Sequence, residues 1–273
     1  MSGITKQTVN LIQLRRRETA ETCPKHPDCH LVYIKGLDKV KPFCEQCQHE
    51  QIQVQDQQMQ KNVIIRRYRG FLRDASLVDR ADAFNYTFDN FWGEADEKGN
   101  ATPEQTVKHN AGTIAAFYYK FPDKNGNSLL YGNAGAGKTH LAMAILNAIN
   151  DRSNPMQKCL FLSVNKLMRE MKYWFSDNTG IWSPRHVTDI VHEADVVVLD
   201  DLGAESANNM ASSFVQDAIF DIYESNQRVI TTTNLGMDEL YQTYHERVVS
   251  RMQEGYMSRV IDFTKIADKR SRI

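Results

Sequence analysis

The sequence lacks a charge excess of either sign, because its 33 lysines and arginines are balanced by 34 aspartates and glutamates. A net charge of −1 excludes a protein that holds nucleic acid through one global basic field, so any such contact must be local. No apolar stretch approaches the length of a membrane span, and the first ten residues lack the apolar core of a signal peptide. No internal repeat is apparent. We therefore expect a cytoplasmic protein whose 273 residues form one substantial core and a small appended module.

Cysteine is also scarce, and its distribution is uneven. Five cysteines in so long a chain do not suggest a secreted disulfide framework, and four of them fall between positions 23 and 47. The pair Cys23-x2-His26 and the pair Cys44-x2-Cys47, with seventeen residues between them, are typical of two turns that bind one tetrahedral Zn²⁺. The sequence therefore predicts a zinc-binding module over about residues 21–48.

The fourth zinc ligand is the least certain of the set. Cys29 is an alternative to His26, and His30 and His49 are further candidates. Residues 31–34 are predicted to form a short strand of a zinc ribbon, whose folding energy would come from the metal. The competing interpretation is a set of free thiols.

The most informative motif is GNAGAGKT, which follows an apolar run, Leu129–Tyr131, and precedes a helical pattern. It matches the P-loop, in which glycines let the backbone N–H groups surround the β- and γ-phosphates of a nucleotide. Lys138 should reach those phosphates, and Thr139 should hold Mg²⁺. The residues expected to contact the nucleotide here are Gly132, Asn133, Ala134, Gly135, Ala136, Gly137, Lys138, Thr139 and His140.

Acidic and amide side chains follow two further predicted strands. Residues 194–201 read ADVVVLDD, the pattern of a buried parallel strand that ends in two carboxylates. Asp200 would hold Mg²⁺, and Asp201 would orient and deprotonate the attacking water. Such a base favours hydrolysis of ATP over transfer to a small acceptor. Asn234 ends the β-branched run RVITTT and would contact the γ-phosphate or the water, or would instead cap the turn that follows.

Two arginines lie one helical turn apart in ERVVSR, residues 246–251. An arginine supplied to a neighbour's site accelerates phosphoryl transfer by orders of magnitude. Helical arginines are more often solvated or ion-paired, so Arg247 and Arg251 are candidates only.

We predict two regions. Residues 1–75 would contain a helix over 1–20, the zinc-binding module and a helical linker over 50–74, for which a disordered linker is the alternative. Residues 76–273 would form an ATPase domain on which the aromatic segment 84–92 docks, with a polar loop at 94–103. Strands are predicted at 128–131, 159–164, 196–200, 229–233 and 259–263, and helices at 138–150, 166–175 and 208–224. This alternation predicts an α/β fold with a parallel sheet, flanking helices and no C-terminal lid domain.

The succession SLLYGNAGAGKTHLAMAI, VVVLDDLGAE, VITTTN, HERVVSRM and KRSRI resembles the DnaC/DnaI group of bacterial helicase loaders, AAA+ ATPases related to the initiator DnaA. The resemblance covers about residues 84–273. It implies the roles of Walker A for Lys138 and Thr139, Walker B for Asp200 and Asp201, sensor I for Asn234, arginine finger for Arg251 and sensor II for Arg270, with Arg247 and Arg272 as second choices for the last two.

By this resemblance, we expect a bacterial or phage ATP-dependent loader of a hexameric DnaB-type replicative helicase onto single-stranded DNA. Its cofactors would be ATP, Mg²⁺ and Zn²⁺, and its N-terminal region would engage the helicase. ATP binding between subunits would favour assembly, up to a hexameric spiral, and hydrolysis would release the loader. We expect the DNA contact at residues 172–175 and in the loop that follows them, with a place in the core as the alternative for these aromatics. The alternatives are an IstB-like transposition-helper ATPase and a nucleotide-binding adaptor without significant hydrolysis.

Overall fold

The computed structural model describes residues 16–37, 39–93, 100–177, 179–206, 210–256 and 258–269. The chain divides into two compact units, residues 1–64 and 65–273. This division lies inside the long helix α2 (Glu45–Ala75), earlier than the boundary after residue 75 expected from the sequence. The assignment of separate functions to two regions stays a prediction.

The first unit contains a two-stranded antiparallel sheet of β1 (Arg16–Thr22) and β2 (His30–Ile34), with an irregular register between Glu18 and Thr22. The expected helix over residues 1–20 is therefore wrong for 16–20, and residues 1–15 lie outside the described part. Strand β1 forms because its backbone pairs with β2, an interaction between segments that the local pattern does not reveal. The predicted strand at 31–34 is confirmed as β2.

Helix α2 decides between the two interpretations of the Gln-rich segment, since residues 45–75 are helical throughout. Glu45 in its first turn and Arg73 in its last turn complement the helix dipole. The side chain of Arg16 also contacts Glu45 at 2.8 Å, which ties β1 to the start of the helix.

The second unit is built on a five-stranded sheet in the order β4-β5-β6-β3-β7, with every neighbouring pair parallel. The α/β fold predicted from the sequence is confirmed. The strands are β3 (Ser128–Tyr131), β4 (Cys159–Ser163), β5 (Val196–Leu202), β6 (Val229–Thr233) and β7 (Val260–Asp262).

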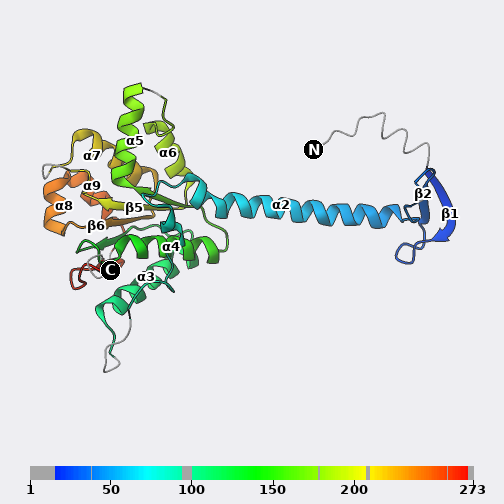
Figure 1. Ribbon diagram of the computed structural model, residues 1–273, viewed down its shortest axis with the longest axis horizontal. Helices are drawn as coiled ribbons and strands as arrows, with labels where there is room; N and C mark the ends of the chain where they lie inside the picture. The colour runs from blue at the N-terminus through cyan, green and yellow to red at the C-terminus, as the bar shows by residue number, and fades with distance from the viewer. Residues whose placement is uncertain are drawn as a thin grey trace. The chain divides into compact units, whose positions relative to one another are not determined.

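Helices cover both faces of this sheet, with α3 and α4 on one side and α5, α6 and α7 on the other (Figure 1). Two of them, α3 and α6, were not expected from the sequence. The helical elements of this unit, after the end of α2, are η1 (Ala81–Asn85), α3 (Pro103–Lys120), α4 (Lys138–Arg152), α5 (Val164–Asp177), α6 (Pro184–Glu193), α7 (Ser213–Ser225), α8 (Met237–Thr243) and α9 (Glu246–Met252).

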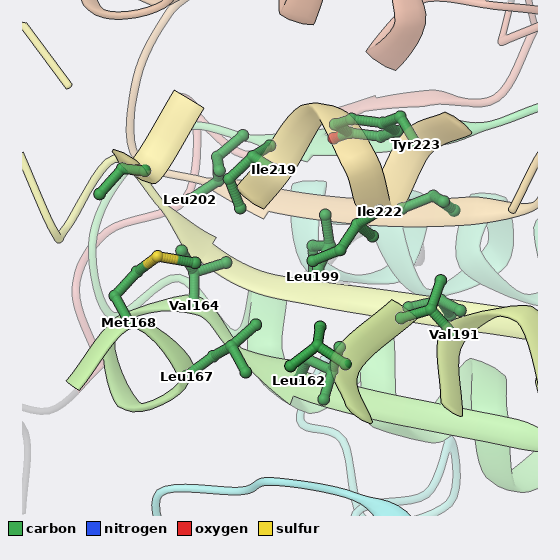
Figure 2. Packing of buried hydrophobic residues seen from close by; sticks show 14 of the residues in the cluster. Leu162, Val164, Leu167, Met168, Val191, Leu199, Leu202, Ile219, Ile222 and Tyr223 are labelled. Atoms are coloured by element: carbon green, nitrogen blue, oxygen red, sulfur yellow. The ribbon is translucent and has the colours of Figure 1, made fainter. Parts of the chain in front are cut away.

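Alternate residues of each strand enter different hydrophobic clusters, because successive side chains point to opposite faces. Leu129 packs into the cluster beneath α5 to α9, whereas Leu130 packs into the cluster beneath α3 and α4. Figure 2 shows the first cluster, where Leu199 of β5 lies among side chains of β4, α5, α6 and α7. Burial on both faces explains why the strands read as continuous apolar runs.

The strand order places the functional motifs at one edge. All five strands are parallel, so their carboxyl ends meet at the same edge of the sheet. Strand β6 lies between β3 and β5, and Asn234, which follows β6, is therefore flanked by the P-loop and by the acids of β5. Among the helices of the described residues, none has the length and apolar character needed to cross a membrane.

Candidate nucleotide site and metal centre

The loop between β3 and α4 contains two glycines at which a side chain would not fit. Gly137 precedes α4 with a φ of 92°, and a Cβ there would lie 2.7 Å from the Phe91 ring. Gly132 has a φ of 126°, and its Cβ would lie 2.7 Å from the backbone of Phe263. Both positions require glycine on steric and conformational grounds. The GNAGAGKT pattern therefore forms a tight loop at the amino end of a helix, the arrangement that binds phosphate.

Lys138 is the first residue of α4 and is 6% exposed. Its ammonium donates hydrogen bonds to the carbonyl oxygens of Gly132 and Asn133 and to Oδ1 of Asn234, each at 2.7 Å. The buried ammonium lies at the amino end of α4, where the loop and the helix terminus favour an anion such as phosphate.

Asp200 lies near the carboxyl end of β5 and is almost fully buried, with 4% exposure. The hydroxyls of Thr139 and Thr232 donate to its two oxygens at 3.1 and 2.7 Å. Burial raises the pKa of Asp200 to about 6, against the lowering effect of these hydroxyls, and the nearby Asp201 and Asp79 raise it further. A hydroxyl and a carboxylate are the hard oxygen donors that Mg²⁺ prefers, and a divalent cation would offset the charge that burial disfavours. The residues present therefore fit a magnesium ion.

Asp201 has a φ of 60°, the only positive value among the described residues other than glycine. The register between β5 and β6 is irregular at this point, and the Asp201 N–H donates to the Thr232 hydroxyl at 2.8 Å. Such strain is characteristic of functional positions, where it aims a side chain out of the regular sheet. The Asn234 amide donates to the Asp201 carboxylate at 2.9 Å. Asn234 thus bridges Lys138 and Asp201.

A cavity of about 580 Å³ joins these groups, a volume typical of small-molecule sites. Sequence reasoning missed one of its walls, which comes from the chain after α2. Leu77 bridges to Leu162 of β4 in parallel, and this places the following residues beside the site. The aromatic segment 84–92 was expected to dock on the core and does so, but its place in the cavity was not anticipated. The unexpected lining residues are Val78, Asp79, Arg80, Ala83, Tyr86, Trp92, Phe161 and Lys269.

His140, the first residue after the P-loop motif, fastens that wall to α4. Its ring stacks on Tyr86 with centroids 4.5 Å apart and planes 5° apart, and Nε2 lies 3.0 Å from the Thr87 carbonyl oxygen. Burial lowers the pKa of His140, which favours the neutral ring. His140 therefore contributes to the shape of the cavity, which it helps to line.

The two candidate arginines lie elsewhere. Arg251, on α9, pairs with Glu224 at 2.5 Å and Glu254 at 3.2 Å, and Arg247 pairs with Asp217 at 2.5 Å. Neither arginine is among the described residues that line the cavity, and the Arg251 side chain is 45% exposed.

The expected Arg270 and its second choice Arg272 lie outside the described residues. The segment just before them does reach the site, because the Lys269 N–H donates to the Gly135 carbonyl at 3.3 Å. The Asn133 amide also donates to the Thr264 and Ile266 carbonyls at 2.8 and 2.9 Å.

In the first unit, the structure brings together Cys23, His26, Cys44 and Cys47, whose ligand atoms all lie within 4.8 Å of one another. His26 Nδ1 is 3.3 Å from the Cys47 sulfur and 3.5 Å from the Cys44 sulfur, and the Cys23 and Cys47 sulfurs are 3.5 Å apart. Tetrahedral zinc with bonds of about 2.0–2.3 Å places its ligand atoms about 3.5–3.8 Å apart, so the four residues fit Zn²⁺.

The alternative ligand, Cys29, is not part of this group. Its thiol donates to the Gln46 side-chain oxygen at 3.1 Å. Neither His30 nor His49 belongs to the group among the residues described. Sequence reasoning missed Glu50, whose carboxylate lies 3.1 Å from Nε2 of His26. A carboxylate on the second ring nitrogen orients a metal-binding histidine, so Glu50 would support the site.

The comparisons with known proteins agree with this geometry. The family model described as IstB-like ATP binding protein matches residues 61–266. The replicative helicase loader DnaC of Escherichia coli K12 is 27% identical over 173 residues, which cover 63% of this chain and 64% of DnaC. The chromosomal replication initiator DnaA of Kosmotoga olearia is 24% identical over 185 residues, 67% of this chain and 37% of DnaA.

Two solved structures share the fold. The crystal structure of DnaI aligns with a TM-score of 0.52 and 24% identity over 68% of this chain and 95% of that one. The crystal structure of the DnaC helicase loader aligns with a TM-score of 0.50 and 23% identity over 67% of this chain and 99% of that one. The resemblance drawn from the motifs is confirmed, although the matched part spans less than two thirds of the curated DnaC. The chain therefore belongs to the IstB-like ATP binding protein family, and its larger unit is a DnaC-like AAA+ domain.

Proposed function

We propose that this protein is an ATP-dependent loader of a hexameric DnaB-type replicative helicase onto single-stranded DNA, in which ATP binding and hydrolysis control assembly and release. The observation that carries the ATPase part is the hydrogen-bonded series Lys138–Asn234–Asp201, which joins the phosphate loop to the expected base across one cavity. The replicative role is supported by the similarity to the helicase loader DnaC.

In this proposal, the phosphates of ATP replace the loop carbonyls as partners of Lys138. Thr139 and Asp200 would hold Mg²⁺, which would neutralise charge on the phosphates. Asp201, whose backbone has a φ of 60°, accepts a proton from the attacking water. Asn234 orients Asp201 through the 2.9 Å hydrogen bond and senses whether Lys138 is occupied by phosphate.

Arg251 completes the site of an adjacent subunit. In the single chain its guanidinium is exposed and held by Glu224 and Glu254. Exchange of these carboxylates for the γ-phosphate of a neighbour would make hydrolysis depend on assembly. Arg270 would contact the nucleotide from within the chain, since Lys269 already lines the cavity.

The zinc-binding module would engage the helicase. Its four ligands fit Zn²⁺, and a segment of this size gains its stability from metal rather than from an apolar core. For DNA we propose the end of α5, where Tyr173 and Phe175 are each 54% exposed beside Lys172. Exposed aromatics next to a cation can stack on unpaired bases and contact phosphate.

The test is a loading assay with purified DnaB-type helicase, circular single-stranded DNA and ATP. Wild-type protein should transfer helicase to the DNA, and Lys138→Ala should abolish both ATP binding and transfer. Transfer at the wild-type level by Lys138→Ala would instead support a nucleotide-binding adaptor without significant hydrolysis.

A transposition helper is the second candidate, because the matching family model is the IstB-like one. Co-purification against a helicase and a transposase separates the two functions. Retention of the transposase alone would replace the proposed function.

A further inference from the structure

The segment after β5 is fastened to the segment before α9. The Ala211 N–H donates to the Thr243 carbonyl at 2.9 Å, and the His245 N–H donates to Oε1 of Gln216 at 2.7 Å. Between these two bonds, the Tyr244 hydroxyl donates to the Glu205 carboxylate. The consecutive residues Thr243, Tyr244 and His245 thus hold the start of α9 against the part of the chain that follows β5.

Glu205 is the centre of this connection because it uses both of its oxygens. Oε2 accepts the Gly203 N–H at 2.9 Å, and Oε1 accepts the Tyr244 hydroxyl and the Ser206 hydroxyl, the latter at 3.3 Å. Gly203 has a φ of 102°, and a Cβ there would lie 2.6 Å from the Leu235 side chain. The carboxylate therefore fixes a tight loop that begins directly after the β5 acids.

Tyr244, the partner of Glu205, is buried and its phenol stays protonated. It is 3% exposed, and burial, together with the charge of Glu205, raises the pKa of its phenol far above the usual range. The phenol accordingly stays protonated and donates to the carboxylate. A charge-assisted hydrogen bond inside the protein is stronger than one at the surface. The Glu205–Tyr244 contact can therefore transmit a movement of the loop after β5 to the start of α9.

The other side of α9 is fixed as well. Arg247 and Arg251 pair with Asp217 and Glu224, both on α7. Helix α9 is thus held by α7 along its length and by the Glu205–Tyr244 contact at its beginning.

We propose that Glu205 is a positioning residue: through Tyr244 it couples the loop after its own Asp201 to α9, and so sets the place of Arg251 in the neighbouring subunit's site. This inference rests on the proposed function, in which Arg251 acts between subunits. By this coupling, the nucleotide state of one subunit changes the position of the Arg251 that this subunit places in the site of the next one.

The test uses mixed assemblies of two full-length variants. Arg251→Ala subunits keep the Walker residues but offer no arginine, whereas Asp201→Asn subunits offer Arg251 but lack the base. Each alone should hydrolyse ATP slowly, and the mixture should recover activity because Asp201→Asn subunits complete the sites of Arg251→Ala subunits. No recovery in this parent mixture would overturn the arrangement between subunits and the inference with it.

Glu205→Gln is then added to one partner at a time. In the Asp201→Asn subunit, which donates the arginine, it should reduce the recovered rate about tenfold or more, as expected for a misplaced catalytic group. In the Arg251→Ala subunit, which holds the active site, the loss should be clearly smaller. An equal or smaller loss on the donating side, or no loss on either side, would refute the inference while leaving the recovery itself, and the proposed function, intact.

Two tyrosine variants test whether the reduced rate comes from a general loss of structure. Tyr244→Phe retains the buried ring and removes only the hydroxyl, so it should reproduce the loss on the donating side. Tyr241→Phe removes a hydroxyl from an exposed tyrosine on α8 and should leave the recovered rate unchanged. A loss with Tyr241→Phe as large as that with Tyr244→Phe would also count against the inference.

Discussion

The side-chain amide of Asn234 donates to the Asp201 carboxylate at 2.9 Å while its oxygen accepts from Lys138 at 2.7 Å. Asn234→Ala should therefore leave Asp201 unsupported and reduce the rate of ATP hydrolysis by about a hundredfold, a loss usual for one positioned polar group. Nucleotide affinity should change little, because the variant retains Lys138 and the P-loop, which would bind the phosphates. Steady-state hydrolysis and equilibrium binding of a fluorescent ATP analogue measure the two effects. Asn125→Ala, an exposed amide outside the cavity lining, is the matched control.

Asp201→Asn should bind ATP with nearly unchanged affinity and hydrolyse it about 10²–10⁴-fold more slowly, because an amide cannot accept the proton from water. The amide retains the size of the carboxylate and can still meet Asn234. Asp221→Asn, on α7, is the control and should keep the wild-type rate. Turnover by Asp201→Asn at that rate would assign the base to another residue.

The strands at the active edge were predictable because their signals are local. Residues 128–131 and 229–233 are short apolar or β-branched runs bounded by glycine, asparagine or charged residues, and both strands have the expected bounds. Helix α3 was missed although Thr102, Pro103 and Gln105 form a readable capping pattern at its start. Its alternation of alanine, aromatic and polar residues does not reveal that Ile114 and Tyr118 are buried.

The cavity wall formed by the chain after α2 could not be predicted from the local sequence pattern. Asp79, Tyr86 and Trp92 line the cavity because Leu77 pairs with Leu162, a contact between segments far apart in the sequence. Strand β1 depends on pairing with β2 in the same way. Motifs with a fixed mechanism, such as the P-loop and the Cys/His spacing, carry their geometry with them, whereas a wall formed by a distant pairing does not.

The buried Asp200 should make the stability of the free protein depend on pH. Its pKa is raised from 3.8 to about 6 in the folded chain, so the folded state binds more protons than the unfolded state between these values. Stability contributed by this group is therefore present at low pH and lost as pH rises towards and through about 6. Without added nucleotide or magnesium, Asp200→Asn should be more stable than wild type by about 1–3 kcal/mol at pH 7.5.

Urea denaturation of both proteins at pH 7.5 and at pH 5 measures this difference. The advantage of Asp200→Asn should shrink at the lower pH, because wild-type Asp200 is then largely protonated. Effects of pH on the rest of the chain cancel in the comparison of the two proteins. The prediction is wrong if Asp200→Asn is no more stable than wild type at pH 7.5, or if its advantage in the free energy of unfolding is larger at pH 5.

The zinc-binding module provides a matched pair of cysteines for the last prediction. Cys44 belongs to the group of four ligands, whereas the Cys29 thiol contacts Gln46 outside it. Elemental analysis should therefore find one zinc per chain in wild type and in Cys29→Ser, and a large loss in Cys44→Ser. Because metal supplies the folding energy of so small a segment, Cys44→Ser should also lose resistance to proteolysis within residues 16–64. Its ATP affinity should be unchanged, since the P-loop and its partners all belong to the other unit. Zinc retained by Cys44→Ser but lost by Cys29→Ser would reverse the ligand assignment.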